Sequence, residues 1–83
     1  MGAIERLAIS KNGFVFDPAT GNSYTVNSTG LFILNLLREG KSEDEIVDAL
    51  VENFEVSQEE ARRDLLDFLE QLRVNGLLEA SNV

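Results

Sequence analysis

The first third of the chain has the short apolar stretches and turn residues that are typical of β-strands. Ile4, Leu7 and Ile9 are the apolar positions of a first run, which ends at residues 10–13 in an Asn-Gly pair. This pair favours a tight hairpin because both residues tolerate positive φ angles. The aromatic and β-branched run at residues 14–16 follows and suits a second strand.

A second turn and a third strand complete this part of the sequence. Residues 17–22 include Pro18, which fixes φ, and Gly21, which accepts positive φ. Residues 23–26 then alternate polar and apolar side chains, as does a strand buried on one face. Two successive hairpins predict a three-stranded antiparallel meander, whose first and last strands each have an unpaired edge.

The rest of the chain has the periodicity and the capping residues of three helices. Residues 27–29 offer N-cap oxygens to a short helix at 31–37, which is apolar nearly all round and is therefore expected to be buried. Capping-box sequences at 42–45 and 57–60 open two further helices, and Asn-Gly at 75–76 ends the last one. The core stripe of this last helix consists of Ala61, Leu65, Phe68, Leu69 and Leu72.

Three strands followed by three helices predict an α+β fold with a winged-helix-like arrangement. The last two helices, joined by a short turn at residues 55–57, form a helix-turn-helix pair attached to the hairpins. Leu77 and Leu78 are expected to pack back on this unit or to add a short extended piece. Since the 83 residues contain no linker and no repeat, residues 1–83 are predicted to form a single domain.

The composition argues against an enzyme. The chain has neither histidine nor cysteine, so its serines lack the usual activating base and the commonest metal ligands are missing. Glu43, Asp44, Glu45 and Asp48 are close in sequence, but they lack the ligand spacing of a calcium loop, which favours a solvated helix face. We expect no catalytic residues, no metal and no cofactor.

The charge balance argues against a nucleic-acid partner. The formal net charge is −8, and the arginines of the last helix are interleaved with acidic residues that would repel phosphate. A winged-helix DNA-binding regulator is therefore the alternative, not the first choice. Apolar runs are too short to span a bilayer and the N-terminus has no signal-peptide pattern, so we expect a cytoplasmic protein without a membrane partner.

Two surfaces are candidates for binding a partner. On the last helix, Arg62, Leu66, Leu69 and Arg73 share a stripe beside the core stripe. A leucine framed by arginines in an acidic protein suits a docking strip. Equally, Leu66 packs as an ordinary shoulder of the core while the arginines pair with acidic neighbours three or four residues away.

The second candidate surface is the edge of the third strand, at residues 23–26. It lacks the lysine or proline that commonly guards an edge, so an extended peptide can add to it as a further strand. A short exposed edge is also tolerated in many small domains. A third possibility is that two copies pair edge to edge as a scaffold, which sedimentation at two concentrations distinguishes.

Residues 13–30, with the sequence GFVFDPATGNSYTVNSTG, resemble the PqqD-like family. The family has a D-x-x-x-G turn, an aromatic strand and an L-N-x-T/V-G segment before an apolar helix, and Val26 stands here where leucine is usual. A capped helix at 46–54 and a long helix that begins near 56–61 also match. The resemblance covers roughly residues 4–79.

This resemblance implies a RiPP recognition element, which binds the leader segment of a ribosomally made precursor peptide. Such domains present the peptide to a modifying enzyme, often a radical SAM protein, and the product is not restricted to pyrroloquinoline quinone. The leader adds beside the third strand and lies against the third helix, where the arginines would select its carboxylates. The implied peptide-binding residues are Asn22, Ser23, Tyr24, Thr25, Val26, Arg62, Leu66, Leu69 and Arg73.

Overall fold

The N-terminal apolar run forms a 3₁₀ helix and a short strand, where one strand was predicted. The computed structural model describes residues 3–76, so the prediction for residues 77–78 lies outside it. Helix η1 spans Ala3–Arg6 and strand β1 only Ala8–Ile9. Ile4 and Leu7 are both buried, because residues three apart eclipse each other in a 3₁₀ turn.

Strands β1, β2 (Phe14–Asp17) and β3 (Asn22–Thr25) form an antiparallel sheet in sequence order. Val15 lies opposite Tyr24 on the face that packs on the core, whereas Phe14 and Phe16 point to the outer face and are exposed. In the first hairpin only Gly13 has a positive φ, of 85°. A Cβ at Gly13 would clash with the carbonyl oxygen of Val26, so glycine is required there.

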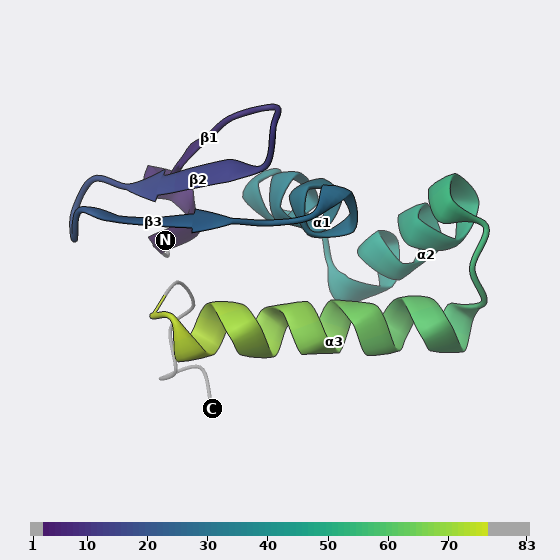
Figure 1. Ribbon diagram of the computed structural model, residues 1–83. Helices are drawn as coiled ribbons and strands as arrows, with labels where there is room; N and C mark the ends of the chain where they lie inside the picture. The colour runs from purple at the N-terminus through teal and green to yellow at the C-terminus, as the bar shows by residue number, and fades with distance from the viewer. Residues whose placement is uncertain (1–2, 77–83) are drawn as a thin grey trace.

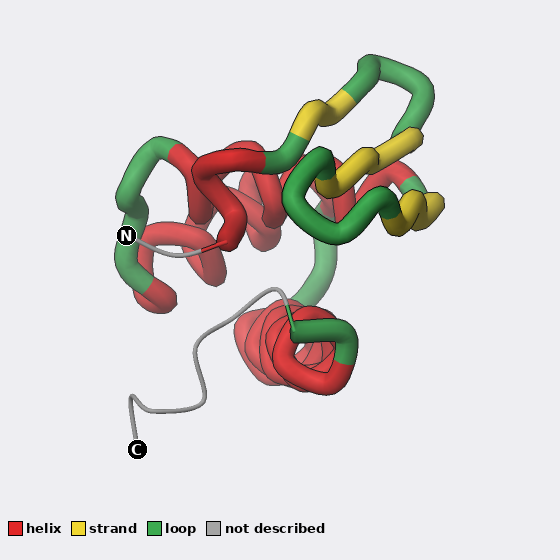
Figure 2. The backbone as a smooth tube through the Cα atoms, turned by 90° about the vertical axis from the view of Figure 1, so that its left-hand side faces the viewer, coloured by secondary structure: helices red, strands yellow, loops and turns green. Residues whose placement is uncertain are grey.

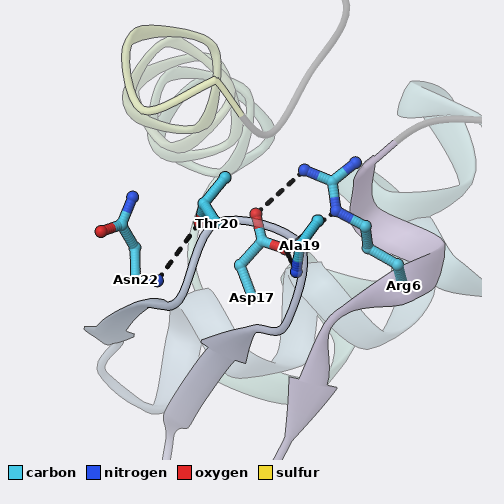
Figure 3. A network of polar contacts seen from close by, with 5 residues as sticks. All are labelled: Arg6, Asp17, Ala19, Thr20 and Asn22. Atoms are coloured by element: carbon cyan, nitrogen blue, oxygen red, sulfur yellow. Dashed lines mark hydrogen bonds and ion pairs between the residues drawn. The ribbon is translucent and has the colours of Figure 1, made fainter.

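The turn between β2 and β3 is held against η1 by the network of Figure 3. Arg6 donates from Nε and Nη2 to both oxygens of the buried Asp17, at 2.8 and 3.0 Å. The Ala19 N–H donates to the same carboxylate at 3.0 Å, and Thr20 Oγ1 accepts from the Asn22 N–H. These bonds account for the aspartate of the D-x-x-x-G turn and fix where β3 begins.

Three helices follow: α1 (Ser28–Arg38), α2 (Glu43–Phe54) and α3 (Gln58–Val74). Asn27 caps α1, and Ser42 with Glu45 forms the predicted reciprocal capping box of α2. At α3 the side chain of Ser57 accepts from the Glu60 N–H, but Glu60 does not complete a box. The turn between α2 and α3 is closed by Glu55 at a left-handed φ of 55°.

Helix α3 runs along one side of the molecule, beneath the sheet and the other two helices in Figure 1. Figure 2 looks along α3 and shows α1 and the sheet above it. The α+β class is therefore confirmed, with three strands before three helices. The core between these elements consists of Ile4, Leu7, Val15, Ile33, Leu34, Ile46, Val47, Leu50, Ala61, Leu65, Phe68 and Leu72.

Candidate functional site

Among the residues that the structure describes, strand β3 has one paired edge and one free edge. Within residues 3–76 it pairs with β2 alone, and the Val26 N–H donates to the carbonyl of Gly13 at 2.9 Å just beyond the strand. Main-chain groups alternate in direction along an antiparallel strand, so those of Tyr24 also face β2. The N–H and C=O groups of Ser23 and Thr25 therefore point to the free edge, where an added strand would pair.

A groove of about 380 Å³ lies where β3 ends beside α3. Its strand side is formed by Thr25, Val26 and Asn27, which lead from β3 into the first turn of α1. The α3 side consists of Asp64, Asp67, Phe68 and Gln71. Residues far apart in the sequence thus form two walls of one site.

The floor of this groove is apolar and closely packed. Phe68 is only 9% exposed, and Ile33 beside it is fully buried. A Cβ at Gly30 would lie 2.9 Å from a ring carbon of Phe68, so the absence of a side chain lets the ring sit against α1. The Asn27 side chain accepts from the Gly30 N–H at 2.8 Å, which fixes this first turn.

The two flanks of α3 face different surroundings. At about 100° per residue, Asp64, Asp67 and Gln71 lie on one side of the core stripe, and Arg62, Leu66 and Arg73 lie on the other. Only the first flank contributes to the groove beside β3. We call it the groove flank, and we call the surface of Arg62, Leu66 and Arg73 the outer flank.

The predicted site residues are accordingly divided between two surfaces. Thr25 and Val26 line the groove. Asn22 and Ser23 are exposed at the start of β3, and Tyr24 is half-buried on the core face of the sheet. The four predicted helix residues, Arg62, Leu66, Leu69 and Arg73, do not line the groove.

The contacts of the outer flank bear on the two interpretations of this stripe, which were a docking strip or ordinary core packing with paired arginines. Arg73 pairs with Glu70 three residues earlier, which lowers the pKa of Glu70, and Arg62 pairs with Asp44 of α2 at 2.8 Å. Leu66 is 49% exposed and does not pack as a shoulder of the core, whereas Leu69 is partly buried against it. A second hollow of about 490 Å³ includes Arg62 and Leu66 but not Arg73, and it extends past Arg63 to Asp67.

Sequence reasoning missed several groove residues. Phe68 was assigned to the core alone, Asp64 and Asp67 were considered only as acidic residues that would repel phosphate, and Gln71 was not considered. The one signal in the sequence that pointed to this groove was Gly30, because it ends the V-N-S-T-G segment that resembles the family pattern.

Metal binding and membrane insertion were checked in the part of the protein that the structure describes. No three acidic side chains come together there as a metal site, the acidic start of α2 included. Among the helices of residues 3–76, none has the length and apolar character needed to cross a membrane.

The fold and site thus define a small α+β domain with an open strand edge that ends at a groove. The sequence matches the family described as coenzyme PQQ synthesis protein D (PqqD) over residues 13–78. None of the curated proteins is a sequence match. The chain belongs to the PqqD family.

Two solved structures share this fold. "TbiB1 in Complex with the TbiA(beta) Leader Peptide" is 35% identical, with a TM-score of 0.79 over 89% of this chain and 87% of that one. "Lasso peptide synthetase B1 complexed with the leader peptide" is 26% identical, with a TM-score of 0.77 over 88% and 87%. Both contain a leader peptide, which favours a peptide-binding domain over the DNA-binding alternative.

Proposed function

We propose that this chain binds the leader segment of a ribosomally made precursor peptide as an added strand beside β3. The observation that carries the proposal is the geometry of the free edge. Main-chain groups of Ser23 and Thr25 point outward, and the same edge ends at an apolar-floored groove against α3. The leader peptides in the two similar complexes support the same class of ligand.

The two parts of the site have separate roles in this mechanism. Hydrogen bonds to the outward groups of β3 hold the peptide in an extended conformation with little regard to its sequence. Alternate side chains of the added strand face the same side, so an apolar residue can enter the groove above Phe68. Such an edge-plus-groove site is consistent with a Kd of about 1 µM, or about −8 kcal/mol.

The domain itself performs no chemical step in this proposal. It raises the local concentration of the precursor beside a modifying enzyme, which is a radical SAM protein or another enzyme that acts on peptides. That enzyme then meets its substrate more often because the domain holds the peptide nearby. We place this work in the cytoplasm, where precursor peptides are made, and assign the domain no cofactor.

An amide NMR titration tests the proposal. The labelled domain is mixed with synthetic leaders from short open reading frames beside its gene. It is also mixed with the TbiA(β) leader, which is the peptide bound in one of the two similar structures. Shifts concentrated at residues 22–30 and at the groove flank of α3 are expected. Shifts confined to other surfaces with every peptide, or none at near-millimolar peptide, contradict the proposal, and a response to protein concentration alone indicates edge-to-edge dimers instead.

A further inference from the structure

The charged side chains that line the groove are acidic. Asp64 and Asp67 stand on its α3 wall, and none of the described residues that line it is a lysine or arginine. The remaining polar side chains there are uncharged, and that of Asn27 is already engaged as the cap of α1.

Neither carboxylate has an ion-pair partner among residues 3–76. The ion pairs among residues 3–76 join Arg6 to Asp17, Arg62 to Asp44 and Arg73 to Glu70. Arg62 and Arg73 thus compensate acids away from the groove, and Asp64 and Asp67 are left without a cationic partner in that part of the chain. The negative potential of the domain therefore extends to the wall that a bound peptide would face.

We propose that the groove selects a peptide that carries a lysine or arginine on the same face as its apolar anchor. This specificity rests on the proposed function, because the peptide must first add to β3. Side chains on one face of a strand are two residues apart, so the basic residue is expected two or four positions from the anchor. The carboxylates of Asp64 and Asp67 then receive the ammonium or guanidinium group, while the anchor covers Phe68.

The preference is the opposite of the one suggested by the arginines of α3. Those arginines lie outside the groove lining, and two of them already pair with acidic side chains. A leader rich in acidic residues would instead meet Asp64 and Asp67 as like charges.

A displayed library of random 12-residue peptides tests the proposal at physiological salt. It is selected on the wild-type domain, and individual winners are measured on Asp64→Asn/Asp67→Asn. A control, Asp48→Asn/Glu52→Gln, removes the same amount of charge from exposed positions of α2 that lie outside the groove. Circular dichroism verifies that each variant is folded.

We expect winners with a basic residue two or four positions from an apolar one. Partly exposed charge pairs predict about a three- to tenfold loss of affinity on the groove variant and less than about twofold on the control. Replacing the basic residue by glutamine should give the same loss, with no further loss on the groove variant.

Winners without a basic preference, or equal losses on both variants, overturn the selectivity and leave strand addition intact. If no winner depends on the β3 edge, as measured with Thr25→Pro, the proposed function itself fails.

Discussion

The two flanks of α3 differ in both the sign of their charges and their surroundings. On the outer flank, Arg62 and Arg73 pair with acidic partners and Leu66 is exposed. On the groove flank, Asp64 and Asp67 have no such partners among the described residues and stand over an apolar floor. The charges of Arg62 and Arg73 are thus compensated on the outer flank, whereas those of Asp64 and Asp67 are left available beside the open edge of β3.

The largest effect on peptide binding is expected from Thr25→Pro, which removes an outward N–H from the free edge. Proline is tolerated on the edge of a sheet where its N–H is not used in pairing, so the fold should survive. The loss of one hydrogen bond and the bulk of the ring should weaken peptide binding by at least about tenfold. Isothermal calorimetry measures this, and Thr25→Val, which keeps the N–H and the branched shape, should bind almost normally.

Asp17→Asn should give the largest loss of stability among these variants, because it removes the charge of the buried Asp17 side chain with which Arg6 pairs. Arg6, and next the Ala19 N–H, lower the pKa of Asp17 to about 2. Since the folded state favours the carboxylate, this stabilisation is complete above the ordinary pKa of about 3.9 and is lost as pH falls towards 2. Urea unfolding from pH 7 to 2 should show this slope in the wild type and a much smaller one in Asp17→Asn.

Gly30→Ala, in α1, should have an intermediate effect on peptide binding, through the floor of the groove. Its Cβ would lie 2.9 Å from the ring of Phe68, so the ring must move and the groove floor changes. Overpacking of this kind costs about 1–3 kcal/mol in stability, and we expect several-fold weaker peptide binding. Thermal unfolding and calorimetry report the two quantities. Gly40→Ala is the control, because Gly40 has a positive φ and an added Cβ there meets no atom within 4 Å, so this variant strains the backbone without touching the groove. An equal loss of binding there would contradict a local effect.

The smallest effect is expected on the outer flank. Leu66→Ser and Arg73→Gln should change peptide affinity by less than about twofold, because neither side chain lines the groove. Fluorescence anisotropy with a labelled peptide is sufficient. A tenfold loss with Leu66→Ser would transfer the binding surface to the outer flank.

Local chemistry accounts for the parts of the fold that the sequence predicted. The caps at Asn27, Ser42 and Ser57 and the turn at Gly13 depend on nearest neighbours, so each was visible in the chain itself. The free edge of β3 followed from the number of hairpins. The left-handed turn at Glu55 was not visible as such, because no glycine or asparagine marks it.

The site was only half predictable, for a geometric reason. Periodicity places Leu66 and Asp67 on either side of the core stripe of α3, but it does not say which side the sheet occupies. That choice is made by how α2 and α3 pack against α1, through contacts distant in sequence. Composition then favoured the leucine and arginines as a docking strip, whereas the structure puts acidic residues and Phe68 beside β3.

Photo-crosslinking tests the central claim most directly, since it compares the two flanks of α3 in one experiment. Benzoylphenylalanine is introduced in place of Gln71 on the groove flank or in place of Leu66 on the outer flank, and each protein is irradiated with a peptide that passed the NMR titration. We predict efficient crosslinks from position 71 and background levels from position 66. Crosslinks from position 66 without any from position 71 would contradict the groove between β3 and α3 as the peptide site.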